Sequence, residues 1–298
     1  MRDISDTARW VAYYRALETD RADAVFRDPY ARALAGDRGE KIAKAQKFMD
    51  QNAWSFVART VLFDRFITEA VRGGADLVVN LAAGLDTRPY RMDLPKTLRW
   101  VEVDLPGILD YKEGILKGAA PVCALERVRL DLSDQTARRA LFARLGASSS
   151  RAVIVTEGLL IYLSQAEVAS FGRDLASVPP FHTWITDLAS PALVKVMIAR
   201  GGDMIAAAGA PFKFAPPEGP NFFVPLGWKP VQVASMLKTA RRLNRLPFFL
   251  KMISFLPWPE KPPPSLPWSA VCVLQRGLSE PSPAGRPWLC RRQSPGRR

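Results

Sequence analysis

The chain has 298 residues, of which 48% are hydrophobic and 24% are charged. This composition is ordinary for a globular protein and excludes a fibrous or wholly disordered chain, and the length suits one large α/β domain or two smaller ones. Three cysteines are too widely spaced for a disulfide framework or a set of metal ligands, so no metal site is expected. No apolar run reaches the roughly 18 residues of a spanning helix, and the N-terminus lacks the apolar stretch of a signal peptide. We therefore expect a cytoplasmic protein with no membrane partner.

The formal net charge is +13, and part of this excess is local. Six Arg and one Glu lie between Arg276 and Arg298, which leaves +8 for the rest of the chain. A basic surface attracts nucleic acid or other anions, but the body has no basic cluster with interleaved aromatic residues. We expect no nucleic-acid partner. Residues 278–298, rich in Pro, Gly, Ser and Arg, are predicted to form a basic disordered tail.

The first 72 residues are predicted to be helical. Apolar side chains at helical spacing follow Ser5 and Asp6, and Asp28-Pro29-Tyr30 opens a second helix that should end near Gly36. A third apolar stripe predicts a helix from about residue 53 to 71.

The pattern then changes to short apolar runs that alternate with helical segments. The runs are residues 76–81, 99–104, 127–131, 151–157 and 182–187, and a final strand follows at 269–275. Such alternation predicts an α/β fold with a doubly wound, mostly parallel sheet. We expect one domain over 1–277, made of an N-terminal helical cap (1–72), a cofactor-binding core (73–190), a helical lid or substrate insertion (191–264) and the final strand (265–277).

Four of the five strands end at or beside an acidic residue, namely Asp104, Asp131, Glu157 and Asp187. In sheets of this kind, ligands bind outside the carboxyl ends of the strands. Gly84, in the loop after the first strand, permits a tight turn and a close backbone approach to a ligand. Gly-x-Gly-x-x-Gly is absent, which argues against a pyrophosphate cofactor such as NAD. The carboxylate of Asp104 can accept hydrogen bonds from both ribose hydroxyls of a nucleoside.

Four motifs carry a resemblance to a known family: NLAAGLDTRPYR (80–91), WVEVDLP (100–106), RLDLSD (129–134) and TEGLLIYL (156–163). In this order and spacing they are similar to the leucine carboxyl methyltransferase superfamily, in its bacterial branch of S-adenosylmethionine-dependent O-methyltransferases. The resemblance covers about residues 5–275. It implies the seven-stranded Rossmann-like fold of class I methyltransferases, with S-adenosyl-L-methionine as the cofactor.

The resemblance also implies roles for individual residues. Asp104 matches the ribose-binding acid, Asp131 and Leu132 the pair beside the adenine, and Glu157 the acid of the fourth strand. Arg59 matches, more loosely, a basic residue that contacts the carboxylate of the methionine moiety. The family often has Gly-x-Gly after the first strand, and Ala82 stands here at the first of these two positions, before Gly84.

The methyl acceptor is expected to be a small molecule that offers a carboxylate or a hydroxyl oxygen. A carboxylate is already ionised near neutral pH, whereas a phenol requires a base. The single histidine, His182, begins the fifth strand at the end of the sheet opposite the cofactor, so it is interpreted as structural and no general base is assigned. Arg88, Arg91 and Tyr13 are candidates to bind the acceptor, although both arginines could instead form structural salt bridges. An NAD-dependent oxidoreductase and a non-catalytic nucleic-acid-binding protein are the alternative functions.

Overall fold

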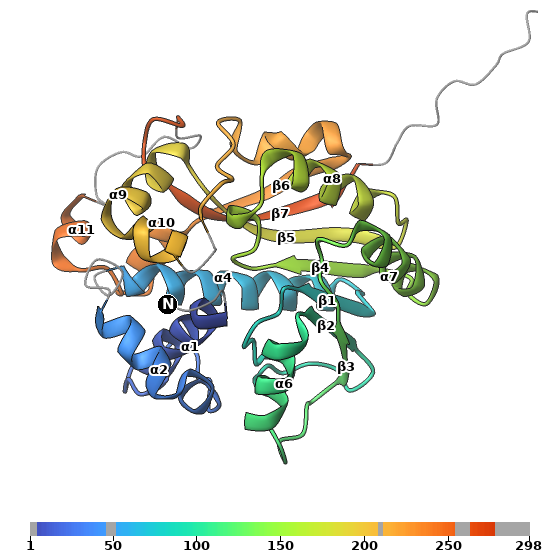
Figure 1. Cartoon of the computed structure of the whole chain (residues 1–298), viewed down its shortest axis with the longest axis horizontal. Coiled ribbons are helices and arrows are strands. Elements are labelled where there is room, and N and C mark those ends of the chain that lie inside the picture. The colour runs from blue at the N-terminus through green and yellow to red at the C-terminus, as the bar shows by residue number, and fades with distance from the viewer. Residues whose placement is uncertain (1–4, 46–51, 208–210, 254–262, 278–298) are drawn as a thin grey trace, which may run out of the picture.

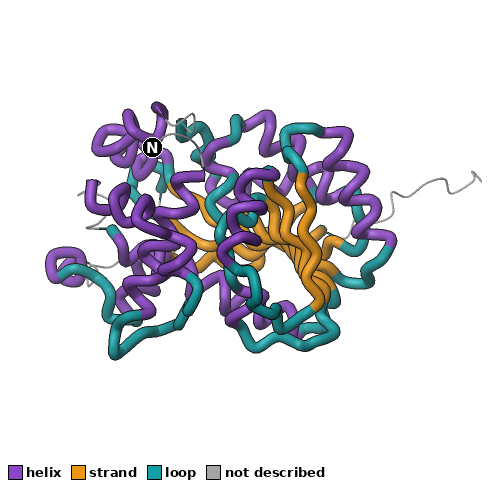
Figure 2. Tube along the Cα trace, turned by 60° about the horizontal axis from the view of Figure 1, so that its bottom comes forward, coloured by secondary structure: helices purple, strands orange, loops and turns teal. Residues whose placement is uncertain are grey.

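The computed structural model describes residues 5–45, 52–207, 211–253 and 263–277. The predicted disordered tail, 278–298, lies outside the described residues. A seven-stranded sheet forms the centre of the molecule, and helices pack on both of its faces (Figures 1 and 2). The strands are β1 (Leu77–Leu81), β2 (Arg99–Asp104), β3 (Ala124–Arg129), β4 (Ala152–Thr156), β5 (Phe181–Ala189), β6 (Trp228–Ser235) and β7 (Ser269–Arg276).

The strand order is β3-β2-β1-β4-β5-β7-β6. Strands β1 to β5 pair in parallel, and β7 runs antiparallel to both β5 and β6. The order therefore reverses between β1 and β4, which places a crevice at their carboxyl ends. This topology confirms the predicted doubly wound, mostly parallel sheet.

The described helices connect and cover the strands. They are α1 (Ser5–Thr19), α2 (Ala31–Ala45), α4 (Ala53–Arg72), α5 (Arg88–Arg91), α6 (Pro106–Ile115), α7 (Gln135–Ala147), α8 (Gln165–Ala176), α9 (Pro191–Ala207), α10 (Met236–Arg242), α11 (Phe248–Ile253) and the 3-10 segments η1 (Leu160–Tyr162) and η2 (Gly219–Leu226). None of the helices in the described part of the chain combines the length and the apolar character needed to cross a bilayer.

The core has two main layers because side chains of a strand alternate between the faces of the sheet. Val78 on β1 packs with Phe63 and Phe66 of α4, while Leu77 and Val79 point into the opposite layer. That second layer contains residues of α7, α8 and η2. A third cluster joins α1 and α2 to α6 and sets the N-terminal helices beside the crevice.

Three predicted boundaries differ from the structure. The third strand was predicted at 127–131 but spans Ala124–Arg129, because it pairs with β2 from Arg99↔Ala124 to Asp104↔Arg129. The fifth strand continues through Asp187 to Ala189, because its last residues pair with β7. The helix predicted to end near Gly36 resumes after a kink there, where the glycine has φ 55° and ψ −178°.

The segment expected to be a helical insertion also contains a strand, for which the sequence GWKPVQV (227–233) is a candidate. β6 (Trp228–Ser235) pairs with β7 at the edge of the sheet, and the helices α9, α10 and α11 of the same segment gather at one end of the molecule (Figure 1). The boundaries of cap, core and lid remain predictions.

Candidate functional site

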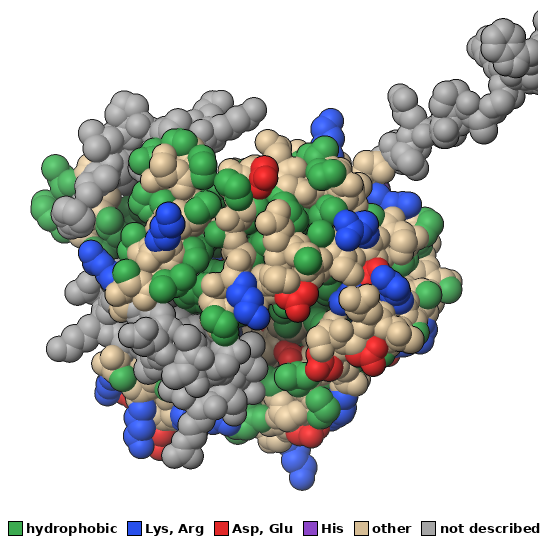
Figure 3. All heavy atoms as spheres, turned by 45° about the horizontal axis from the view of Figure 1, so that its top comes forward, with side chains coloured by type: hydrophobic (Ala, Val, Ile, Leu, Met, Phe, Trp, Pro, Cys, Tyr) green, Lys and Arg blue, Asp and Glu red, His purple; other side chains and the backbone are tan. Residues whose placement is uncertain are grey.

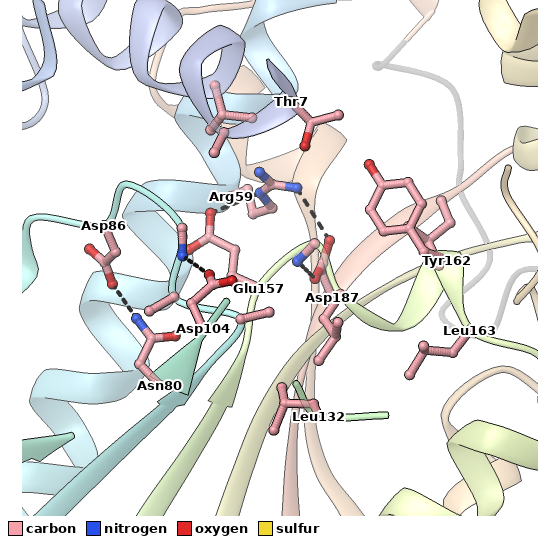
Figure 4. A pocket seen from close by; sticks show the side chains of 18 of the residues that line it. Thr7, Arg59, Asn80, Asp86, Asp104, Leu132, Glu157, Tyr162, Leu163 and Asp187 are labelled. Carbon is pink, nitrogen blue, oxygen red and sulfur yellow. Dashed lines mark hydrogen bonds and ion pairs between the residues drawn. The ribbon is translucent and has the colours of Figure 1, made fainter. Parts of the chain in front are cut away.

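A cavity of about 550 Å³ opens at the carboxyl ends of the parallel strands. Its walls come from α1, the first half of α4, the loops after β1 to β4, the C-terminal part of β5, α9 and the loop before η2. This is the crevice that the reversal of strand order between β1 and β4 predicts. Figure 4 shows how its polar side chains converge.

The loop after β1 is fastened to the end of β2. The backbone N–H of Gly84 donates to Oδ2 of Asp104 over 2.6 Å, and the N–H of Leu105 donates to Oδ1 over 2.7 Å. Burial raises the pKa of Asp104 above its ordinary value. Both Gly84 (φ 51°) and Ala82 (φ 54°) have left-handed backbone, which an alanine adopts only at a cost. The glycine that the family often has at position 82 would adopt this backbone without strain.

Asp131 and Leu132 line the same cavity on the far side of Asp104. Asp131 lies two residues beyond the end of β3, where its Oδ1 accepts a hydrogen bond of 2.8 Å from the N–H of Ser133. The Leu132 carbonyl accepts from Arg138 over 2.7 Å. Asp104, predicted to bind the ribose, and Asp131 and Leu132, predicted to lie beside the adenine, are therefore on the same wall of the cavity.

The opposite wall carries a charged cluster around Glu157, which follows β4. Arg59 Nε lies 3.0 Å from Glu157 Oε1, and its Nη1 lies 3.4 Å from Asp187 Oδ2 (Figure 4). Despite burial, which opposes the effect, the charges of Glu157 and Asp187 raise the pKa of Arg59. A helix residue from α4 and two strand-end acids thus meet, although 98 and 128 positions separate Arg59 from these acids along the chain.

Arg88 and Arg91 are engaged with carboxylates from several elements. Arg88 is 3% exposed and lies 2.7 Å from Asp64, 3.0 Å from Asp86 and 2.9 Å from Glu157. Arg91 pairs with Asp64 over 2.7 Å. Despite the burial of its carboxyl group, the charge of Arg88 lowers the pKa of Asp86 to about 2. Both arginines line the cavity. Their contacts are ion pairs with acids of the protein, as expected if they form structural salt bridges and not if they are held free for an acceptor.

Tyr13 and His182 do not line the cavity. Tyr13 packs edge to face on Tyr14 in the cluster of the N-terminal helices and is not part of the cavity wall. Its role in binding the acceptor stays a prediction without support from the cavity. His182 lies at the amino end of β5, where its Nδ1 is 3.5 Å from Arg151. Burial lowers the pKa of His182.

The sequence analysis did not single out several polar residues of the site. The side-chain amide of Asn80, on β1, donates a hydrogen bond of 2.7 Å to Oδ2 of Asp86 and so ties the loop after β1 to that strand. The ring of Tyr162, in η1, lies beside Asp187 and stacks at a tilt on Phe212 with 5.7 Å between ring centroids (Figure 4). Burial raises the pKa of Tyr162 to about 12. The sequence offered one signal for Tyr162, its place in the motif TEGLLIYL (156–163). Its contact with Phe212, 50 positions further along the chain, has no signal in the sequence.

The part of the chain that the structure describes contains no group of three or more His, Cys, Asp or Glu side chains arranged to hold a metal ion.

The distribution of charge on the surface bears on the alternative of a nucleic-acid-binding protein. On the face shown in Figure 3, Lys and Arg side chains are scattered among apolar and neutral ones and do not merge into a patch.

Comparison with known proteins decides the family. The sequence profile of the family described as leucine carboxyl methyltransferase matches residues 8–175, more than half of the chain. The chain belongs to the leucine carboxyl methyltransferase family. The resemblance inferred from the four motifs is thereby confirmed.

Three relatives carry the name "Putative S-adenosyl-L-methionine-dependent methyltransferase". One from Streptomyces coelicolor is 36% identical over 191 residues, which cover 57% of this chain and 65% of the relative. One from Streptomyces avermitilis is 34% identical over 173 residues (54% and 60%), and one from Mycobacterium tuberculosis is 35% identical over 174 residues (54% and 57%). This chain thus spans less than two thirds of the length of these relatives.

Two solved structures share the fold of this family member. A DUF574 family protein from Streptomyces avermitilis has a TM-score of 0.58 at 13% identity, covering 91% of this chain and 97% of its own. A structure from Thermobifida fusca, described as "a putative methyltransferase", has a TM-score of 0.52 at 16% identity and covers 90% of this chain and 94% of its own. At such identities the likeness concerns the fold alone, and it confirms the predicted class I methyltransferase architecture.

Proposed function

We propose that this protein is a methyltransferase that uses S-adenosyl-L-methionine and transfers the methyl group to an oxygen of a small molecule. The observation that carries the proposal is the arrangement of Asp104, Glu157 and Arg59 around one cavity at the switch in strand order. Family membership and the names of the relatives support the same cofactor.

The residues present fit this cofactor. Asp104 faces the cavity with a carboxylate that can accept from ribose hydroxyls, and Asp131 and Leu132 would flank the adenine. Arg59 would bind the carboxylate of the methionine moiety. The loop from Ala82 to Gly84 has one glycine and no phosphate cradle, which suits a cofactor without phosphate.

The charge of the site supports a cationic cofactor over a dinucleotide. Two cations, Arg59 and Arg88, face three carboxylates, Glu157, Asp187 and Asp86. The cluster therefore carries an excess negative charge, and its side chains are mostly shielded from solvent, where salt screens charges only weakly. S-adenosylmethionine, with a sulfonium and an ammonium against one carboxylate, is a net cation, whereas the pyrophosphate of NAD would be repelled.

When bound, the cofactor supplies an electrophilic methyl carbon on its sulfonium. The protein has to align the acceptor oxygen with that carbon and sulfur and to exclude water, and such positioning is worth up to roughly 7–11 kcal/mol. Asp104 and Glu157 would fix the two ends of the cofactor. We further propose that residues 1–72 and 191–264 act as cap and lid, since Val11 of α1, Leu193 and Met197 of α9, and Phe212 all line the cavity. These apolar walls suit a small apolar acceptor.

Calorimetric titration with S-adenosylhomocysteine tests the cofactor, and NADH serves as the competing ligand. Binding of S-adenosylhomocysteine without binding of NADH supports the proposal, and the reverse result contradicts it. Mass spectrometry of cell metabolites, incubated with the protein and isotope-labelled S-adenosylmethionine, then tests methyl transfer. Label in a small molecule is the expected result; label found only in protein or nucleic acid would exclude a small-molecule acceptor.

A further inference from the structure

The sheet order separates the two halves of the cavity. β2 and β3, with Asp104 and the Asp131 loop, lie on one side of β1, and β4 and β5 lie on the other. A cofactor held by Asp104 at one end and by Glu157 at the other would therefore leave the space above β5 for the acceptor. Asp187 of β5 lies in this second half, beside Leu188, and the apolar residues Leu193, Met197 and Phe212 line the same cavity.

The two carboxylates of this half are held differently. Glu157 has an arginine on each oxygen, with Arg59 at 3.0 Å from Oε1 and Arg88 at 2.9 Å from Oε2. Asp187 accepts a hydrogen bond of 2.7 Å from the N–H of Gly158 through Oδ1, and the cation nearest to its Oδ2 is Arg59 at 3.4 Å. Because a carboxylate oxygen accepts more than one hydrogen bond, Oδ2 of Asp187 retains capacity for a donor in the cavity.

The cations of the cavity are all engaged with acids. The five arginines that line it each form an ion pair or hydrogen bond with a carboxylate: Arg15 with Asp28, Arg59 with Glu157 and Asp187, Arg88 with Asp64, Asp86 and Glu157, Arg91 with Asp64, and Arg138 with Asp174. An anionic acceptor would enter beside Glu157 and Asp187, and the sulfonium of the cofactor would be its one counterion that is not already paired with an acid. A neutral acceptor is not repelled by these carboxylates, and it also avoids the cost of burying a further charge.

We propose that Asp187 is the general base of the reaction and that the acceptor is an apolar compound with a phenol-type or enol-type hydroxyl group. This inference rests on the proposed methyltransferase function and names the substrate class of the same site. The hydroxyl hydrogen-bonds to Oδ2 of Asp187. Its proton passes to Asp187 as the oxygen forms a bond to the methyl carbon, and the carbon–sulfur bond breaks with its electron pair left on sulfur. The products are the methyl ether, neutral S-adenosylhomocysteine and protonated Asp187, which returns its proton to solvent.

Other groups of the described chain suit this role less well. The pKa of Tyr162 is raised to about 12 by burial, so its hydroxyl stays protonated and can only orient the acceptor. His182 lies at the opposite end of β5. The groups that face Asp187 are Arg59 from α4, Glu157 from the loop after β4, Tyr162 from η1 and Cys272 from β7. Burial raises the pKa of Asp187, which makes it a stronger base than an exposed aspartate.

The test compares Asp187→Asn with the wild type on a matched pair of probes, 2-naphthol and 2-naphthoate, with labelled S-adenosylmethionine. The amide keeps an oxygen for the N–H of Gly158, so the fold and the affinity for S-adenosylhomocysteine should be retained. Wild-type protein should methylate the naphthol in preference to the naphthoate. The variant should lose about a hundredfold or more in kcat, in line with the usual worth of a general base.

The pH profile separates a base from a merely structural residue. On the acid side of the profile, the wild-type rate should fall as Asp187 becomes protonated. The Asp187→Asn rate should rise about tenfold per pH unit toward the pKa of the naphthol, near 10, because naphtholate needs no base. Asp110→Asn, which removes an exposed carboxylate paired with Arg129 on the surface, is the matched control and should behave as wild type.

Each outcome bears on one part of the proposal. If wild-type protein does not bind S-adenosylhomocysteine, the proposed function itself fails. Binding together with methylation of the naphthoate, or of neither probe, overturns the apolar hydroxyl acceptor. Methylation of the naphthol at an unchanged rate and with an unchanged pH profile in Asp187→Asn overturns the role of Asp187 and leaves the methyltransferase function standing.

Discussion

The backbone N–H of Gly84 donates a hydrogen bond of 2.6 Å to Oδ2 of Asp104 and so joins the loop after β1 to the end of β2. These two residues are 20 positions apart in the chain. The bond holds the carboxylate toward the cavity, where a ribose would meet it, and shapes the loop that passes under the cofactor. The position of one acid thus depends on the conformation of one glycine.

Asp104→Ala should abolish most of the affinity for S-adenosylhomocysteine. The change removes two ribose acceptors and the anchor of Gly84, and a hydrogen bond to a charged group is worth about 1.5–3 kcal/mol, so we expect a loss of about tenfold to more than a hundredfold. Calorimetric titration measures the dissociation constant. Asp110→Ala, on the surface of α6, controls for the loss of a carboxylate. Unchanged affinity in Asp104→Ala would refute the ribose assignment.

Arg88→Gln should destabilise the fold strongly. The guanidinium is 3% exposed and faces Asp64, Asp86 and Glu157. Its removal leaves the buried Asp86 without its ion-pair partner and leaves Asp64 and Glu157 with one arginine each instead of two. Breaking a buried ion pair typically costs about 3–5 kcal/mol, which denaturant titration can measure. Arg129→Gln, at an exposed pair with Asp110, is the control and should cost under about 1 kcal/mol. If Arg88→Gln instead kept its stability and lost only acceptor binding, Arg88 would be a substrate residue.

The same cluster should make the protein sensitive to acid. The pKa of Asp86 is depressed from 3.8 to about 2, and that of Asp64 is also lowered, because Arg88 and Arg91 stabilise both anions against their burial. Their contribution to stability is therefore present above pH 3.8 and is lost as the pH falls from about 4 toward 2. Asp86 alone would account for about 2 kcal/mol at neutral pH. Unfolding free energies measured from pH 5 to pH 2 should decline more steeply in wild type than in Asp86→Asn.

The sequence predicted the sheet and the row of acids because both depend on local patterns. Short apolar runs mark buried strands, and an acid that follows such a run must lie at the carboxyl edge of the sheet. The partners of those acids were not predictable in the same way. Arg88 is near Asp86 in sequence, but its contact with Asp64 joins α5 to α4 across 24 residues. The end of β5 was misjudged because its last pairs form with β7, a strand that begins 80 residues after β5 ends. Patterns within one segment do not encode such pairings.

The basic tail should be dispensable for cofactor binding. Residues 278–298 carry five of the six C-terminal arginines and follow β7, whereas the described residues that line the cavity all precede Arg276. Truncation after Gly277 should leave the dissociation constant of S-adenosylhomocysteine unchanged within about twofold. Calorimetry at low and at high salt is the measurement, since a contribution of the arginines would fade as salt increases. A large loss of affinity at low salt would show that the tail takes part in the site.

Ala82→Gly should strengthen both the fold and the binding of the cofactor. Ala82 has φ 54°, a left-handed backbone that costs a residue with a Cβ roughly 1–2 kcal/mol and costs glycine very little. Glycine also adds about 0.5–1 kcal/mol of entropy to the unfolded chain. The net gain should be on the order of 0.5–1 kcal/mol in the free energy of unfolding, with a tighter complex because the methyl group no longer faces the cavity. Ala83→Gly is the matched control: Ala83 is buried, has no positive φ, and donates its N–H to Val103 over 3.2 Å, so the same change there should destabilise the protein. Equal losses of stability in both variants would mean that the left-handed backbone at Ala82 carries no strain.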